Sequence, residues 1–145
     1  MTQEIEVLLV EDNPNDAEIT IRALKKSHLA NRVLHVKDGD EALDFLFSEG
    51  VYEGRKLDRS LKVILLDLKM PRLNGLEVLL RIKGDERTKK IPVVVLTSSN
   101  EEPDIKKCFE LGVNNYLVKP VEIEQFHKAI SELGLFWLIV NQSPL

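Results

Sequence analysis

Short apolar runs alternate with segments of helical periodicity along the chain. Runs of four or five residues rich in valine, leucine and isoleucine, bounded by turn residues, are typical of buried strands. Such strands are expected at Glu6–Val10, Arg32–Val36, Lys62–Leu66, Pro92–Leu96 and Asn115–Val118. The third and fourth runs are nearly all apolar, which favours strands that are covered on both faces.

The segments between these runs have the spacing of amphipathic helices. Helices are expected at about Pro14–Ser27, Gly39–Phe47, Gly75–Lys83, Pro103–Leu111 and from Val121 onward. Asn13-Pro14 supplies an N-cap and a first-turn proline for the first helix, and Gly112 marks the end of the fourth. Alternating strands and helices predict an α/β domain with a doubly wound, three-layer arrangement.

Length and composition agree with one globular domain. The 145 residues include 43% hydrophobic and 30% charged residues, enough for an ordinary core and a charged surface. The net charge is -4, and no block of basic residues indicates binding to nucleic acid or lipid. We therefore expect one domain over residues 1–145 and no direct contact with nucleic acid.

The expected location is the cytoplasm. No cationic segment precedes the first apolar run, which argues against a signal peptide. The longest C-terminal apolar run, Leu135–Val140, is too short to cross a bilayer, so no membrane insertion is expected. The one cysteine, Cys108, cannot form an internal disulfide and suits a reducing compartment.

Acidic residues stand where the first and third apolar runs end. Glu11 and Asp12 follow the first run, and Asp67 follows the third. Parallel strands end at one edge of the sheet, where such folds bind ligands, so these carboxylates are expected in one crevice. They repel each other unless protons or a cation offset their charge, and Mg2+ is the predicted cofactor. Glu11-Asp12 could instead cap the following helix, which does not exclude metal binding.

The fourth and fifth runs end at the same edge and add a hydroxyl and an ammonium. Thr97 follows the fourth run, and Lys119 follows the fifth. A carboxylate can accept a phosphoryl group as an acyl phosphate. A metal ion and a lysine can offset charge on the transferring oxygens, so the set predicts phosphoryl transfer.

These residues resemble the receiver domains of two-component response regulators. The resemblance extends from about Glu4 to Leu133 and rests on Glu11-Asp12, Asp67-Leu68-Lys69-Met70-Pro71, Gly75, Thr97-Ser98, Tyr116 and Lys119-Pro120. It implies a flavodoxin-like fold, a doubly wound five-stranded parallel sheet of order 2-1-3-4-5 with helices on both faces. It also implies that a histidine kinase donates the phosphoryl group.

The resemblance implies a role for each acid. Asp67 would be the phospho-acceptor and a metal ligand. Asp12 would bind Mg2+ directly, Glu11 would bind it through water, and the backbone carbonyl of Lys69 would complete the protein ligands. Glu11 stands where many receivers have aspartate, and its extra methylene leaves the metal affinity open.

The resemblance also implies the parts of a switch. Thr97 would bond a phosphoryl oxygen, and Lys119 would pair with the phosphoryl group or with Asp67. Tyr116 would swing inward on activation, and the Lys119-Pro120 peptide bond would be cis.

Within receivers, the chain is similar to single-domain regulators that partner bacterial phytochrome kinases. This finer resemblance rests on Val10-Glu11-Asp12-Asn13-Pro14, the long loop before Leu61 and the ending Gly134–Asn141. The chain ends at Leu145 without an effector domain, so output is expected through protein contacts. The loop Ser48–Ser60 is either functional or a tolerated surface insertion.

The C-terminal segment predicts a homodimer. The last helix has an apolar stripe for the sheet at Ile123, Phe126, Ile130 and Leu133. A helical extension from about 134 would follow, and Leu135–Val140 would be apolar on every side of it. Exposed apolar surface usually marks an interaction site, here the last helix, its tail and the neighbouring surface of the fifth strand. The alternative is that the tail folds back onto its own domain.

Two other functions are compatible with parts of this pattern. One is a phosphatase or dehalogenase with an aspartate nucleophile. Such phosphatases carry an Asp-x-Asp motif after their first strand. Here Asp67 follows the third strand, and Lys69 stands where the second aspartate of that motif would be. The other is a binding module of the same fold that acts without phosphorylation. The complete set of acceptor, metal ligands and lysine counts against it.

Overall fold

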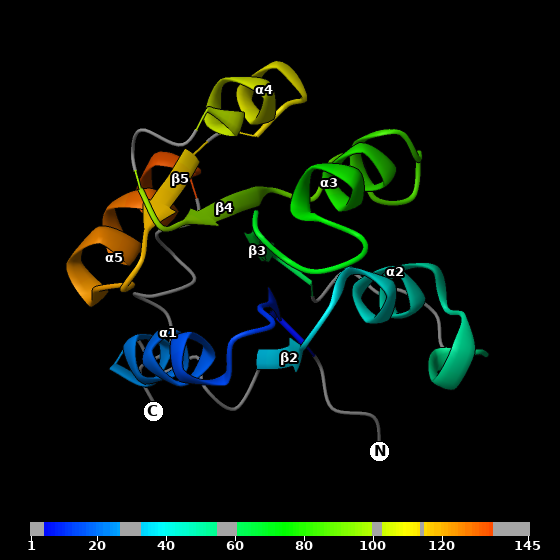
Figure 1. Ribbon diagram of the computed structural model, residues 1–145, viewed down its shortest axis with the longest axis horizontal. Coiled ribbons are helices and arrows are strands. Elements are labelled where there is room, and N and C mark those ends of the chain that lie inside the picture. The colour runs from blue at the N-terminus through cyan, green and yellow to red at the C-terminus, as the bar shows by residue number, and fades with distance from the viewer. Residues whose placement is uncertain (1–4, 27–32, 55–60, 100–102, 114, 135–145) are drawn as a thin grey trace.

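One parallel sheet organises the protein. The structure is a computed structural model that describes residues 5–26, 33–54, 61–99, 103–113 and 115–134. The strands are β1 (Val7–Val10), β2 (Val33–Val36), β3 (Val63–Asp67), β4 (Val93–Thr97) and β5 (Asn115–Val118). They pair in the order β2-β1-β3-β4-β5, all in parallel (Figure 1). The predicted fold class and strand order are confirmed.

The helices follow the predicted segments to within a few residues. They are α1 (Pro14–Lys26), α2 (Gly39–Phe47), α3 (Gly75–Lys83), α4 (Asp104–Glu110) and α5 (Ile123–Glu132). The main difference lies at the strand ends, because Asp67 and Thr97 are the last residues of β3 and β4 rather than the residues after them. Both remain in the ladder, where Asp67 pairs with Leu96 and Thr97 with Val118.

The two faces of the sheet carry separate cores. Alternate strand residues such as Leu9 and Leu65 pack with α1 and α5 on one face. Their neighbours, such as Leu8 and Ile64, pack with α2, α3 and the buried Cys108 of α4 on the other (Figure 1). Because both faces are covered, the central strands are apolar up to their last residues, which are Asp67 in β3 and Thr97 in β4.

Three helices begin with side-chain caps. The Asn13 side chain accepts hydrogen bonds from the backbone N–H groups of Asn15 and Asp16 at the start of α1. Asp38 caps α2, and Asn74 forms a capping box at the start of α3. These caps fix where α1, α2 and α3 begin, directly after the loops that follow β1, β2 and β3.

The described part of the predicted loop Ser48–Ser60 is anchored to the core. It contains a short 3-10 helix, η2 (Gly50–Tyr52), and the Tyr52 ring packs edge to face on Phe45 with centroids 5.3 Å apart. The rest of that loop lies outside the described residues. This contact gives the loop a packing role near α2.

The structure describes α5 but not the tail that follows it. Phe126 and Ile130 are fully buried and the half-buried Leu133 packs on the same core, so these three members of the predicted apolar stripe are confirmed. Ile123 is half-buried and does not belong to that core cluster. The predicted extension from about 134 and the run Leu135–Val140 lie outside the described residues. No helix in the described part of the chain is long and apolar enough to span a bilayer.

Candidate functional site

The ends of β1 and β3 bring three carboxylates together. Glu11 and Asp12 directly follow β1, and Asp67 is the last residue of β3. Carboxylate oxygens from the three residues lie within 4.8 Å of one another, as the strand order predicted. Glu11 and Asp67 are 0% and 2% exposed, whereas Asp12 is exposed. The site therefore has two buried acids and one acid open to solvent.

The backbone of Glu11 is held from several sides. Its N–H donates to the carbonyl of Val36 on β2 at 3.1 Å. Its carbonyl accepts a hydrogen bond from Nε2 of His35, at 2.8 Å. Its side-chain Oε2 accepts from the backbone N–H of Asn13 at 3.2 Å. These contacts fix the turn that carries both acids between β1 and α1.

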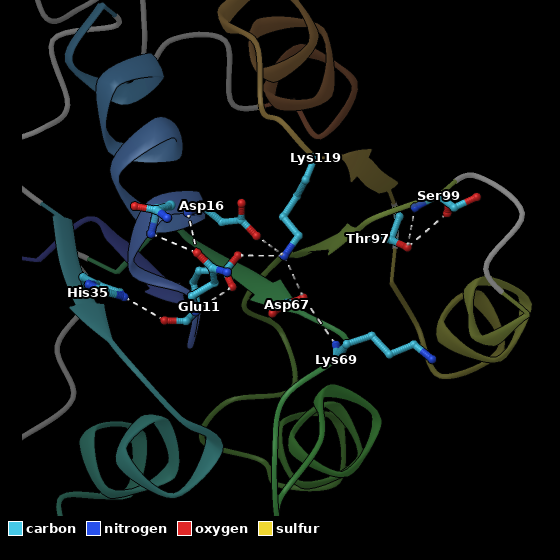
Figure 2. Close-up of polar contacts among 10 residues, drawn as sticks. Glu11, Asp16, His35, Asp67, Lys69, Thr97, Ser99 and Lys119 are labelled. Carbon is cyan, nitrogen blue, oxygen red and sulfur yellow. Dashed lines mark hydrogen bonds and ion pairs between the residues drawn. The ribbon is translucent and has the colours of Figure 1, made fainter.

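The ammonium of Lys119 lies between the carboxylates of Glu11, Asp16 and Asp67 (Figure 2). Its Nζ lies 3.1 Å from Oε1 of Glu11, 3.0 Å from Oδ2 of Asp16 and 3.4 Å from Oδ1 of Asp67. Its backbone N–H donates to the carbonyl of Thr97 at 2.7 Å, which fixes the residue directly after β5. The predicted proximity of Lys119 to Asp67 is confirmed, and Asp16 is an additional partner.

The excess of acids changes the protonation of the site. Burial, a hydrogen bond with Glu11 and the negative charge of Glu11 raise the pKa of Asp67 to about 8, although Lys119 and the N–H of Lys69 oppose the rise. Burial alone would lower the pKa of Lys119. Its hydrogen bond to Asp16 and the charges of Asp67 and Glu11 outweigh that effect and raise it. Lys119 therefore stays charged, and the crowded acids favour an added cation.

The loop after Asp67 is attached to the neighbouring α2. The backbone N–H of Lys69 donates to Oδ1 of Asp67 at 3.3 Å. Farther along, Arg72 has a left-handed backbone, with φ of 63°, and its guanidinium lies 3.2 Å from Oδ2 of Asp38, the cap of α2. The loop that carries the Lys69 carbonyl is thus bound to the protein at both ends.

Thr97 and Tyr116 lie near the same edge but contact other residues. The Thr97 hydroxyl donates to the backbone carbonyl of Ser99 at 3.0 Å, apart from the acidic cluster (Figure 2). The half-buried Tyr116 ring packs edge to face with Phe109 of α4, with centroids 6.2 Å apart. The predicted cis bond between Lys119 and Pro120 is present. The roles of Thr97 and Tyr116 toward a phosphoryl group stay predictions.

A buried carboxylate beside an ammonium and two further acids suits phosphoryl transfer to an aspartate. The family model of the response regulator receiver domain matches residues 7–131. The chain belongs to this receiver family. Receivers are signalling domains of response regulators, whose partners are histidine kinases.

Two curated relatives are similar to this receiver over most of its length. It is 39% identical over 132 residues to the response regulator Rcp1 of Synechocystis sp., covering 91% of this chain and 88% of Rcp1. It is 41% identical over 139 residues to a probable methanogenesis regulatory protein, FilR2, of Methanothrix harundinacea, covering 95% of this chain and 86% of FilR2.

Solved structures agree with the finer resemblance to phytochrome regulators. The bacteriophytochrome response regulator AtBRR is 52% identical, with a TM-score of 0.83 and coverage of 94% of this chain and 96% of AtBRR. RtBRR, another bacteriophytochrome response regulator, is 50% identical, with a TM-score of 0.85 and coverage of 97% and 84%. The Mn2+-bound form of Rcp1 is 38% identical, with a TM-score of 0.73 and coverage of 92% and 94%.

Three further residues contact the site or its loops and were not predicted from the sequence. None of them lies at the end of a central strand. Asp16 lies in the first turn of α1, His35 on the edge strand β2, and Arg72 in the loop after β3. Asp16 had a usable signal, because an acid in the first turn of a helix that follows Glu11-Asp12 lies near the same sheet edge. His35 and Arg72 had none, because their partners are distant in sequence.

Proposed function

We propose that this receiver accepts a phosphoryl group on Asp67 from a histidine kinase and signals through protein contacts. The observation that carries the proposal is the buried Asp67 carboxylate, 3.4 Å from the Lys119 ammonium and grouped with Glu11 and Asp12. A carboxylate oxygen of Asp67 attacks phosphorus, and the bond from phosphorus to the donor breaks, leaving an acyl phosphate. The decisive experiment is phosphoryl labelling of an Asp67 variant.

The residues around Asp67 act on the transferring group in different ways. Lys119 offsets negative charge on the phosphoryl oxygens, and Thr97 bonds one of them once its hydroxyl leaves Ser99. The charge and acceptor oxygens of the phosphoryl group shift the conformations of the loops after β3 and β4, and Tyr116 changes position in response. We propose that its own phosphorylation and dephosphorylation are the only reactions this protein catalyses.

The acid set fits a hard divalent cation. Its donors are all oxygens, and they are close enough to share one ion. Asp12 would bind Mg2+ directly, Glu11 through water, and Asp67 and the carbonyl of Lys69 would complete the protein ligands. When bound, the ion would offset charge on the phosphoryl oxygens. The Mn2+-bound form of Rcp1 supports this proposal.

Mg2+ is expected to stabilise the folded protein through Asp12. If Mg2+ binds only the folded state, about 100 times its Kd adds about 2.7 kcal/mol and raises Tm by roughly 5–10 °C. Asp12→Ala should lose most of this increase, measured by thermal unfolding with and without Mg2+. Without metal, this variant should melt slightly higher than wild type, because one repelling charge is gone.

The exposed Asp40 at the start of α2 provides a control for that measurement. Asp40→Ala should keep the full response of Tm to Mg2+, because Asp40 is not part of the acid cluster. An Asp12→Ala protein that melts below wild type in the absence of metal would show that carboxylate crowding does not destabilise the site.

We propose that the kinase is of the phytochrome type. The names and structures of AtBRR, RtBRR and Rcp1 support this, and the resemblance includes the Glu11-Asp12-Asn13-Pro14 segment. FilR2 and Rcp1 are about equally identical to this chain, but FilR2 is named for methanogenesis. A direct phosphotransfer assay must therefore decide which type of kinase is the partner. Transfer from a purified bacteriophytochrome kinase should be faster than from a histidine kinase without a photosensory region.

We also propose that the protein is cytoplasmic, since Cys108 suits a reducing compartment.

We also propose a homodimer formed by α5, the tail after it and the neighbouring surface of β5. A groove of about 340 Å³ between β5 and α5 lies on this surface, and the adjacent α4 exposes 43% of Phe109. The apolar run Leu135–Val140 follows directly in sequence. Aromatic residues such as Trp137 are enriched at the centres of interfaces.

Removal of the apolar tail is expected to give a folded monomer. Truncation after Leu133, or Trp137→Glu, should halve the mass measured by sedimentation. Phosphoryl labelling of Asp67 should stay intact, because the acid site lies near the N-terminal end of α5 and the truncation removes residues beyond its C-terminal end. Gln142→Glu adds a charge outside the apolar run and should remain dimeric. An intact chain that sediments as a monomer at tens of micromolar, phosphorylated or not, would refute the dimer.

A further inference from the structure

Lys119 has one acidic partner that the proposed metal set leaves out. Its Nζ contacts Glu11, Asp16 and Asp67 at 3.1, 3.0 and 3.4 Å. Glu11 and Asp67 belong to the cluster that can hold a cation, and Asp16 does not. An ammonium has three N–H donors, so one donor can point to each acid.

Asp16 comes from a different layer of the protein than the other two acids. It lies in the first turn of α1, where the Asn13 cap accepts a hydrogen bond from its backbone N–H at 3.0 Å. The cap fixes the backbone of Asp16, and its carboxylate points to Nζ of Lys119 (Figure 2). The side chain is 34% exposed, so this acid is more open to solvent than Glu11 or Asp67.

We infer that Asp16 is a positioning residue that anchors the Lys119 ammonium beside Asp67 for phosphoryl transfer. This inference rests on the proposed function. Cation binding and phosphorylation both use oxygens of Glu11 and Asp67, so those two contacts to Lys119 weaken during the reaction. The contact with Asp16 requires no such exchange. The lysine therefore keeps one fixed partner while its other N–H groups turn to the phosphoryl oxygens.

Charge alone predicts the opposite effect of removing Asp16. A neutral residue at position 16 would reduce repulsion of the anionic phosphodonor and should speed labelling. If Asp16 positions Lys119, its removal instead lets the ammonium move, and the maximal labelling rate falls. The sign of the change in rate therefore separates the two roles.

The test is labelling by acetyl phosphate with saturating Mg2+, followed by intact mass over time. Asp16→Asn should lower the maximal rate roughly three- to ten-fold, since Lys119 would be misplaced but not lost. Asp16→Glu restores the charge and should recover part of the rate. Glu18→Gln is the matched control, because it removes a charge from the same helix but its partner is Arg22. This control should label like wild type.

A double-mutant cycle shows whether Asp16 acts through Lys119. In a Lys119→Met background, Asp16→Asn should cause no further loss of rate. In metal-free protein, the same cycle in urea unfolding should show a coupling between the two residues, which tests the contact without any reaction.

Three results would overturn the inference. They are an unchanged or faster rate in Asp16→Asn, an equal loss of rate in the Lys119→Met background, and no coupling in urea. If wild type labels and Asp16→Asn labels equally well, the inference fails and the proposed function stands. If wild type itself takes no phosphoryl group, both fail.

Discussion

Asp67→Asn is expected to eliminate the phosphoryl adduct that wild type forms with acetyl phosphate and Mg2+, while leaving the protein folded. The amide nitrogen and oxygen of asparagine cannot replace the carboxylate nucleophile. Asparagine is nearly isosteric with aspartate, so the buried end of β3 should keep its packing. Intact mass measures the adduct, and circular dichroism with thermal unfolding measures the fold.

Asp40→Asn is a suitable control for this experiment. Asp40 is exposed in the first turn of α2, and its replacement should leave labelling at the wild-type level. Undiminished labelling of folded Asp67→Asn protein would show that another residue is the acceptor. Wild-type partner binding by an unlabelled Asp67→Asn protein would instead favour the module that acts without phosphorylation.

The sheet could be predicted from sequence because its strands are covered on both faces. Runs such as Val63–Leu66 have no other stable position in a domain of this size, and their polar neighbours mark where they end. The short strands pair in parallel, so the acids, the hydroxyl and the lysine at or just after their ends lie at one edge of the sheet. That is why Glu11, Asp12, Asp67, Thr97 and Lys119 could be assigned to this edge from the sequence.

The remaining parts of the site depend on geometry that sequence patterns do not contain. Asp16 reaches Lys119 because of the rotation of α1 about its axis, and residue 16 and residue 119 are far apart in sequence. Arg72 reaches Asp38 through a left-handed backbone that its residue type does not indicate. The sequence also could not show that Glu11 is buried while the adjacent Asp12 is exposed.

Gly75 joins the acceptor strand to α3 by close packing of the backbone. It is the first residue of α3, and its N–H donates to the carbonyl of Leu68 at 3.0 Å. A Cβ at this position would lie 2.5 Å from the backbone oxygen of Asp67 and 2.7 Å from Cα of Leu68. Both atoms belong to the backbone at the end of β3, so neither can move without displacing Asp67.

Gly75→Ala should therefore reduce both stability and phosphoryl labelling. Overpacking against backbone is expected to cost about 3 kcal/mol, which lowers Tm by roughly 6–12 °C for a chain of this size. Labelling should slow because the Asp67 carboxylate moves relative to Lys119. Gly84→Ala, at the other end of α3, is the control, since among the described residues its Cβ would meet only the Leu80 oxygen, at 3.0 Å. It should change both quantities much less. A Gly75→Ala protein with wild-type Tm and labelling rate would show that this contact does not determine the position of the acceptor.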